Sequence, residues 1–268
     1  MKKFLICIFC ISIFIFTNCK DSTPLLMERE YCTEEELETR EFPYAMLSEP
    51  DTWNLQYPSG SVEGGMKTAF LTEDFKSKYF SGYKNEDGIE YLRFSLDASD
   101  QGKSTNGSSV RAELSNSHYW TLQDKTSLSY SFYLTSTNFS LAKFTVGQFL
   151  QHCTEKHSPL CRIEIENGNI IAVVNNYLPD GRNKPDNTHK YSMGSINQYQ
   201  EVSIKIEIDN GTMNLYRDNE LKGTHVFHED VSRDFTNYYK AGIYYQNKDS
   251  PKIFSEIFMR NLEVSIEN

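Results

Sequence analysis

The sequence lacks an apolar run long enough to cross a bilayer as a helix. A spanning helix needs about 20 consecutive apolar residues, whereas the longest run covers only residues 4–16 (FLICIFCISIFIF). A protein with several membrane-spanning helices is therefore excluded. Cations are also scarce, because 27 Lys and Arg stand against 37 Asp and Glu, for a net charge of −10. With no basic stripe, nucleic acid is not an expected partner.

Beyond Cys19, the sequence also lacks the spacings of a structural zinc site, since it contains no CxxC and no HxxxH. No metal site is expected there. Cys32, Cys153 and Cys161 are the cysteines of this part, and an odd number cannot all pair within one chain. Cys153 and Cys161 flank a short polar loop and can form a disulfide in an oxidising compartment. Cys32 is then expected to be free.

The first residues carry a targeting pattern. Lys2 and Lys3 precede the apolar run, and Cys19 follows it. This order indicates a signal peptide over residues 1–19. A cysteine at this place resembles the lipidation site of a bacterial lipoprotein, although Asn18 is larger than the usual residue before it. Lipid anchoring at Cys19, simple secretion and an uncleaved anchor stay open. All three place the folded part outside the cytoplasm, in the cell envelope (outer surface or periplasm) or secreted.

The remainder divides into an acidic tether, residues 20–42, and one expected domain, residues 43–268. Apolar and polar residues alternate within 127–134, 201–208 and 257–266, as in half-buried strands. Asn-Gly pairs lie between such runs and predict hairpin turns; they are Asn167-Gly168 and Asn210-Gly211. Long amphipathic helical periods are absent. The predicted fold class is all-β, an antiparallel β-sandwich of jelly-roll type, expected to be a monomer.

Three segments carry residue types suited to binding or chemistry. In residues 108–115 (SSVRAELS), Arg111 and Glu113 point to one side of a strand, and Ala112 and Leu114 to the other. A guanidinium held by a carboxylate can bind a second carboxylate in a fixed orientation. Taken alone, an ordinary surface salt bridge explains this segment better.

The second segment, residues 145–152 (TVGQFLQH), places Gln148, Leu150 and His152 on one face. A Gln amide can donate to a carboxylate or a hydroxyl, although a polar residue on a half-exposed strand is the plainer explanation. The third segment, residues 238–246 (YYKAGIYYQ), has two unlike faces. One face is apolar, and the other is lined by Tyr238, Lys240, Gly242, Tyr244 and Gln246. A glycine inside a strand often marks close approach by a ligand or another backbone, and a cation beside a tyrosine favours the phenolate. The alternative is an ordinary tyrosine-rich strand.

In this order and spacing, the segments resemble the hallmark strands of the alginate lyases of polysaccharide lyase family 7: R-(S/T)-E-L, Q-(I/V)-H and Y-x-K-A-G-x-Y-x-Q. The matching stretches are Arg111-Ala112-Glu113-Leu114, Gln148-Phe149-Leu150 and residues 238–246. With Trp53-x-Leu55-x-x-Pro58 included, the resemblance covers roughly residues 45–266. It implies a jelly roll with a substrate groove across one concave sheet, in agreement with the strand pattern.

The resemblance also implies the reaction, a β-elimination at a uronic acid of an acidic polysaccharide. The C5 proton is removed, the 4-O-glycosidic bond breaks and a 4,5-unsaturated sugar remains. By analogy, Arg111 and Gln148 neutralise the carboxylate. Tyr244 is the general acid, and also the base where both groups lie on one side of the ring. Glu113 orients Arg111, and the remaining groove residues bind substrate: Lys240, Gln246, His152 and Tyr238.

One position departs from the family pattern, because Leu150 stands where the family has a His that serves as base for one substrate epimer. Three interpretations stay open. Tyr244 can act alone, which limits the enzyme to syn-elimination, as on mannuronate-type linkages. The chain can act on another uronate polymer with a different base, or it can be a non-catalytic glycan-binding surface lipoprotein on the same fold. His152, ~7 Å further along the strand, is a candidate replacement.

No cofactor is required by this mechanism. A structural calcium ion can bind the acidic loops of such a sandwich, although no diagnostic loop is present. The negative net charge repels a polyuronate at long range, so the groove must be locally positive. The cations expected near it are Arg111, Lys240, Lys143 and Arg162. The polar segment 176–198 is expected to be a long loop and a candidate lid.

Overall fold

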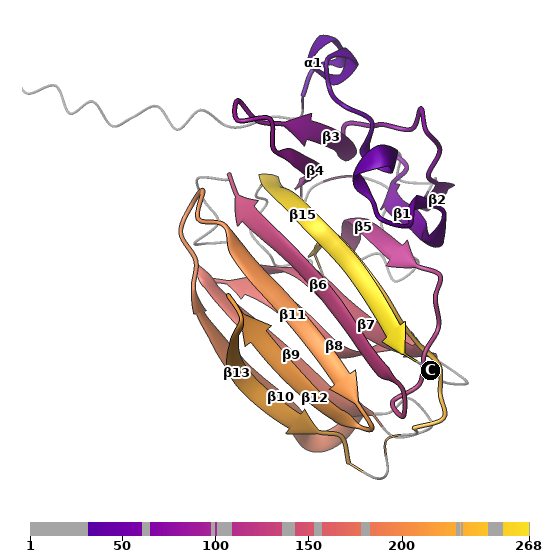
Figure 1. The fold of residues 1–268 in the computed structure, drawn as a ribbon, viewed down its shortest axis with the longest axis vertical. Coiled ribbons are helices and arrows are strands. Elements are labelled where there is room, and N and C mark those ends of the chain that lie inside the picture. Colours follow the sequence, from indigo (N-terminus) through magenta and orange to yellow (C-terminus); the bar gives the residue numbers. More distant parts are fainter. Residues whose placement is uncertain are drawn as a thin grey trace, which may run out of the picture.

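The protein is a sandwich of two antiparallel sheets packed face to face (Figure 1). The computed structural model describes residues 32–60, 65–97, 100, 109–135, 143–152, 157–177, 183–228, 231, 233–245 and 254–267. The eight-stranded sheet has the order β10 (Asn183–Ser195), β9 (Asn169–Tyr177), β8 (His157–Glu166), β7 (Lys143–His152), β14 (Asn237–Tyr245), β5 (Val110–Asn116), β1 (Trp53–Pro58), β2 (Met66–Phe70). The predicted jelly-roll class is confirmed.

The seven-stranded sheet contains every strand predicted from alternation alone. Its order is β13 (Glu220–Val226), β12 (Thr212–Arg217), β11 (Val202–Asp209), β6 (Lys125–Leu134), β15 (Phe254–Glu267), β4 (Glu90–Asp97), β3 (Phe80–Lys84). The alternating apolar side chains of β6 and β11 are buried between the sheets, as Leu128 and Ile206 illustrate. Burial of this apolar face drives the two sheets together.

Both predicted hairpin turns are present. Asn167 and Gly168 have φ values of 51° and 72°, and they join β8 to β9. Asn210 and Gly211 have φ values of 44° and 77°, and they join β11 to β12. Two consecutive positive φ angles define the type I′ turn, whose twist matches that of the flanking strands.

The chain reaches the first strand through short helices: α1 (Glu34–Glu38), η1 (Pro43–Met46) and η2 (Pro50–Thr52). Part of the segment predicted as a tether contacts the domain, because Glu41 forms a β-bridge with Gly82. No helix among the described residues is long and apolar enough to cross a membrane. Residues 1–31 lie outside the described part, so the signal peptide and lipidation at Cys19 stay predictions.

Two expectations need correction. Most of the predicted loop 176–198 is strand, because β9 ends at Tyr177 and β10 runs over Asn183–Ser195. The segment is polar because β10 is an edge strand, and polar side chains are tolerated there. Cys161 is a free thiol buried in the core, where burial raises its pKa. Cys153 lies outside the described residues, and Cys32 is free as expected.

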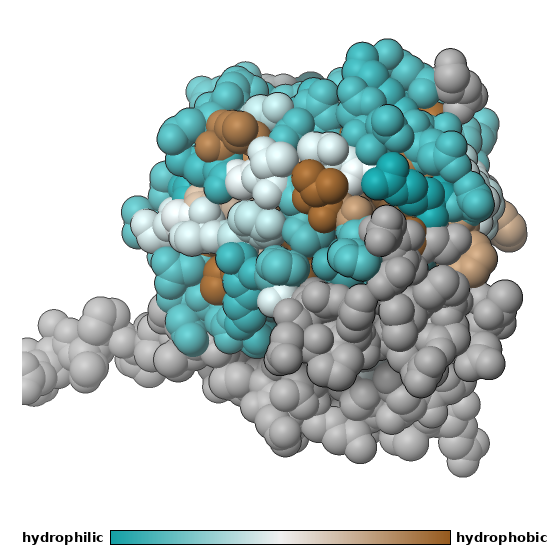
Figure 2. Space-filling view, turned by 90° about the horizontal axis from the view of Figure 1, so that it is seen from below, coloured by the Kyte–Doolittle hydropathy of each residue, from teal (hydrophilic) through white to brown (hydrophobic). Residues whose placement is uncertain are grey.

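Seen from below, the described residues at the surface are mostly hydrophilic, with apolar residues in small separate patches (Figure 2). Scattered apolar residues of this kind are ordinary on protein surfaces. The polar side chains considered next lie on the outer face of the eight-stranded sheet, where the strand alternation turns them away from the core.

Candidate active site

Strand pairing brings the three motif segments together. In the register of β14 with β5, Tyr244 lies opposite Arg111, and Gly242 lies opposite Glu113. On its other edge β14 pairs with β7, where Lys240 lies opposite Gln148. Arg111 and Tyr244, 133 residues apart in the chain, and Gln148 and Lys240, 92 residues apart, are therefore on adjacent strands of the sheet. The predicted faces are correct, since the apolar alternates of β14 are buried in the core: Tyr239, Ala241, Ile243 and Tyr245.

These side chains surround a cavity of about 390 Å³ on the outer face of the sheet. It is lined by Gln56, Arg111, Gln148, Leu150, Pro159, Tyr238, Lys240 and Tyr244. Five of the predicted catalytic and binding residues are in this set, and Glu113 lies directly behind it. A polar cavity with several convergent donors is a typical ligand site.

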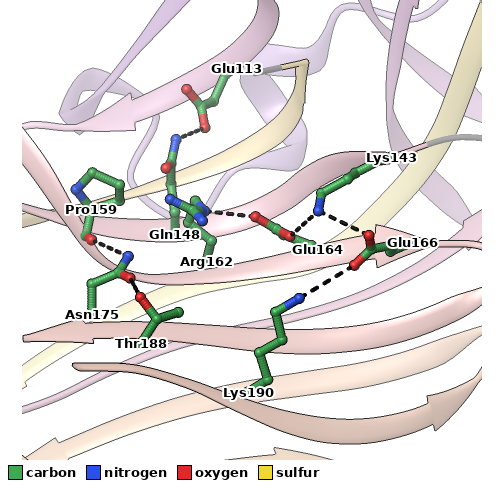
Figure 3. A network of polar contacts seen from close by, with 10 residues as sticks. All are labelled: Glu113, Lys143, Gln148, Pro159, Arg162, Glu164, Glu166, Asn175, Thr188 and Lys190. Carbon is green, nitrogen blue, oxygen red and sulfur yellow. Dashed lines mark hydrogen bonds and ion pairs between the residues drawn. The ribbon is translucent and has the colours of Figure 1, made fainter. Parts of the chain in front are cut away.

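The carboxylate of Glu113 holds three of the lining residues. Its Oε1 accepts from Gln148 Nε2 at 2.5 Å, as Figure 3 shows. Its Oε2 lies 3.4 Å from Arg111 Nη1 and 3.5 Å from Lys240 Nζ. Glu113 is only 1% exposed, and a buried carboxylate needs such partners to offset its desolvation. Glu113 therefore fixes the positions of both cations and of the amide.

Gln56 is the site residue that motif reasoning missed. Its Oε1 accepts from Lys240 Nζ at 2.7 Å and from Arg111 Nη1 at 3.3 Å. It lies opposite Glu113 in the register of β1 with β5. Alternation in Trp53-Asn-Leu55-Gln-Tyr was the available signal, because the two core residues Trp53 and Leu55 turn Gln56 to the outer face.

The tyrosines and the lysine of the cavity differ in their surroundings. The Arg111 guanidinium lies 4.1 Å from the ring centroid of Tyr244, a cation–π contact. Burial raises the pKa of Tyr238, so its hydroxyl stays protonated at neutral pH. Burial lowers the pKa of Lys240 to about 8, against the opposing effect of Glu113. Lys240 is therefore a cation at neutral pH that loses its charge in mildly alkaline solution.

Gly242, the glycine inside β14, lies against the backbone of the neighbouring strand. Its φ is +139°, and a Cβ there would collide with the carbonyl oxygen of Ala112 and crowd the Cα of Glu113. The register of β14 with β7 also shifts between Ala241 and Tyr244. The close neighbour is therefore the backbone of β5. The irregularity adjusts the position of Tyr244 relative to the residues before it.

The position that departs from the family pattern is also in the cavity. Leu150 lies opposite Tyr238 in the register of β7 with β14, and its side chain is 8% exposed. His152 lies further along β7, with its ring 5.0 Å from that of Tyr238. On β7 it lies two residues beyond Leu150, the position of the base in the family pattern, which is roughly 7 Å of strand. Gln246 lies outside the described residues.

A ladder of charges continues across β7, β8 and β10 (Figure 3). Arg162 Nε donates to Glu164 at 2.7 Å, and Lys143 Nζ lies 3.7 Å from Glu164 and 3.0 Å from Glu166. Lys190 Nζ is 4.0 Å from Glu166. With the cavity included, five cations accompany three carboxylates. The cavity itself is locally positive, because Arg111 and Lys240 line it and share the single carboxylate of Glu113. The expected cations Lys143 and Arg162 lie beside it on β7 and β8, where they are paired with Glu164 and Glu166.

The described residues contain no group of three or more His, Cys, Asp or Glu side chains placed to hold a metal ion. Calcium binding therefore stays a prediction. What the cavity does offer is a set of fixed donors for a carboxylate, with a tyrosine hydroxyl beside them.

A jelly roll whose outer face holds fixed donors for a carboxylate, with tyrosines beside them, fits a lyase acting on an acidic polysaccharide. The family model described as alginate lyase matches residues 47–266, and the chain belongs to that family. It is a polysaccharide lyase that cleaves a uronate-containing polysaccharide by β-elimination. No curated protein sequence matches the chain.

Solved structures share the fold. Alginate lyase A1-II′, a member of polysaccharide lyase family 7, has 21% identity and a TM-score of 0.67, covering 82% of this chain and 96% of that one. A variant of A1-II′ in complex with substrate (GGMG) has 18% identity and a TM-score of 0.68, covering 85% and 97%. Alginate lyase PA1167 from Pseudomonas aeruginosa has 19% identity and a TM-score of 0.66, covering 81% and 99%. At these identities the likeness is one of fold.

Proposed function

We propose that this lyase cleaves mannuronate-type linkages by syn-elimination, with Tyr244 as both base and acid. The observation that carries the proposal is Leu150. It lines the cavity where the family pattern has a proton-accepting His, and a Leu side chain can neither accept nor donate a proton. In a mannuronate unit the C5 proton and the C4 oxygen lie on the same side of the ring. One residue can therefore serve both steps.

The substrate carboxylate is the first requirement. The C5 proton is too weakly acidic until the adjacent carboxylate is neutralised. Arg111 and Lys240 supply positive charge to the cavity, and Glu113 holds both in place. The Gln148 amide has a second N–H beyond the one given to Glu113. Donors fixed before the reaction stabilise the charge that develops in the transition state without reorganisation.

Tyr244 then both removes the C5 proton and returns it to the leaving group. Tyr244, as phenolate, takes the C5 proton, and the electron pair of that bond forms the C4–C5 double bond as the C4–O bond breaks. Tyr244 gives the same proton to the departing oxygen and returns to its starting state. Tyr238 is a weaker candidate for the base, because burial raises its pKa. His152 lies too far along β7 for this role.

Other features support the assignment. Gln148 Oε1 is buried and has no hydrogen-bond partner among the described residues, so the amide has spare hydrogen-bonding capacity beside the cavity. The substrate complex of A1-II′ is a variant in which a histidine is changed to asparagine and a tyrosine to phenylalanine, which fits a tyrosine acting in the reaction. Tyr238, Lys240, His152 and Gln246 are proposed to bind the polymer.

The test compares two tyrosines that line one cavity. Tyr244→Phe should lower kcat on polymannuronate by roughly 10³-fold, the scale of general acid–base catalysis, while oligosaccharide affinity stays within about twofold. The matched control, Tyr238→Phe, should keep most of its turnover. New ultraviolet absorbance from the unsaturated product reports the rate. A Tyr244→Phe enzyme with near-normal kcat would refute the assignment.

We also propose that the enzyme is held at the cell envelope by lipid on Cys19. The support is the sequence order of cations, apolar run and cysteine. Cys19→Ala should release the lyase from the membrane fraction into the soluble fraction without loss of activity. Membrane retention of this variant would indicate an uncleaved anchor.

A further inference from the structure

An exposed aromatic ring lies just beyond the cavity and has no place in the reaction. Tyr119 is 56% exposed. Its ring centroid is 6.1 Å from that of Tyr238, which lines the cavity, and 5.2 Å from that of His152. The three rings contact one another edge to face, at interplanar angles of 70° to 87°, and form an aromatic surface that starts at Tyr238 in the cavity and ends in solvent at Tyr119. This surface is named the aromatic shelf below.

The backbone under the shelf is firmly held. Trp120, the next residue, is 1% exposed and stacks on Tyr239 at a centroid distance of 4.8 Å. Its backbone N–H donates to Asn237 O at 3.1 Å, and its carbonyl oxygen accepts from the side-chain amide of Asn237 at 3.2 Å. Tyr119 is thus an exposed ring next to a buried anchor, and placing it against a ligand costs little ordering entropy.

We infer that the aromatic shelf is a subsite that binds a sugar ring of the polymer outside the cleavage position, with Tyr119 as its principal contact. A pyranose ring has an apolar C–H face that packs on an aromatic ring, and the tyrosine hydroxyl adds a polar handle for sugar hydroxyls. The occupant is a uronate unit of the same chain that occupies the cavity, because Tyr238 belongs to both surfaces. This inference rests on the proposed function for the identity of the polymer.

A distal subsite has a distinct kinetic signature. It contributes only when the oligosaccharide is long enough to reach it, so its loss weakens long substrates and spares the shortest ones. Tyr119→Ala should raise KM for polymannuronate about fivefold, the scale of one lost aromatic contact, with kcat on the shortest cleavable oligomer unchanged. Tyr119→Phe should keep most of the affinity. The matched control is Tyr199→Ala, which removes a ring of similar exposure, 59%.

Binding to the Tyr244→Phe chain separates this inference from the proposed function. Hexamers of mannuronate and of guluronate are titrated into Tyr244→Phe alone and with Tyr119→Ala added. Weaker hexamer binding in the double variant, with shorter oligomers unaffected, supports the subsite even if the wild-type enzyme prefers another linkage. The subsite is refuted if Tyr119→Ala weakens the binding of short and long oligomers equally, or if it changes hexamer affinity no more than Tyr199→Ala does. Thermal unfolding of each variant identifies a merely structural effect.

Discussion

Leu150 lies directly opposite Tyr238 on neighbouring strands, and both side chains line the cavity that holds Tyr244. An aliphatic side chain thus occupies the position where the family pattern has a base. Of the hydroxyl groups in the cavity, that of Tyr238 is kept protonated by burial, which raises its pKa. This arrangement supports the proposal that Tyr244 acts alone and that elimination follows the syn course.

Leu150→His should restore a base on the opposite side of the ring. We expect this variant to gain activity on polyguluronate by at least about tenfold, within the range that a general base contributes. Leu150→Gln is the matched control, since it is polar but cannot accept the proton. If both variants gain guluronate activity equally, a base at this position is not what limits the wild-type enzyme.

Gln56→Leu should disturb both cations at once. The substitution removes the acceptor shared by Lys240 and Arg111 while keeping a similar volume. Lys240 is 2% exposed, and a buried group that loses a partner typically costs about 1–3 kcal/mol. We expect a higher KM, a lower kcat and a lower free energy of unfolding. Unchanged kinetics in Gln56→Leu would mean that Glu113 alone positions these cations.

Glu113→Gln should be the most destabilising change in the site. It leaves the buried Lys240 ammonium without its carboxylate, and breaking a buried ion pair from one side typically costs about 3 kcal/mol or more. Urea unfolding measures the loss. The isosteric Gln148→Glu tests an excess of negative charge instead of positive charge, because it places a second carboxylate 2.5 Å from that of Glu113. Wild-type stability in Glu113→Gln would contradict the role of Glu113 as the fixed centre of the network.

Substrate affinity should fall as the pH rises through about 8. Lys240 is charged below its pKa of about 8 and neutral above it, so the cavity loses a cation in this window. The free energy of unfolding should change in the opposite direction to substrate affinity and rise with pH. The folded-state pKa lies below the unfolded value of 10.5, so unfolding takes up a proton between these pH values and Lys240 favours the folded state increasingly with pH. Initial rates from pH 7 to 9 give KM. In Lys240→Met the rise in KM near pH 8 should vanish; its persistence would assign the titration to another group.

The chemistry-bearing strand was predictable because its two faces are chemically distinct. Alternation alone placed Tyr239, Ala241 and Ile243 in the core and turned Lys240 and Tyr244 outward. The Asn-Gly hairpins were predictable for a local reason as well, since asparagine and glycine tolerate the positive φ that a type I′ turn requires.

Other features depend on distant partners and were not predictable. The polar β10 resembles a loop in sequence, and only its pairing with β9 makes it a strand. Gln56 has no distinctive neighbours in the chain, and its role appears once β1 pairs with β5. The sequence spacing of Cys153 and Cys161 allows a disulfide, but it does not show that the side chain of Cys161 points into the core.

The most direct measurement is the initial rate of the wild-type enzyme on polymannuronate and on polyguluronate of matched length, followed by the absorbance of the unsaturated product. We expect a kcat/KM at least about tenfold higher on polymannuronate, since one tyrosine serves both proton transfers only in syn geometry. Equal rates, or faster cleavage of polyguluronate, would contradict this expectation and would require a second base besides Tyr244.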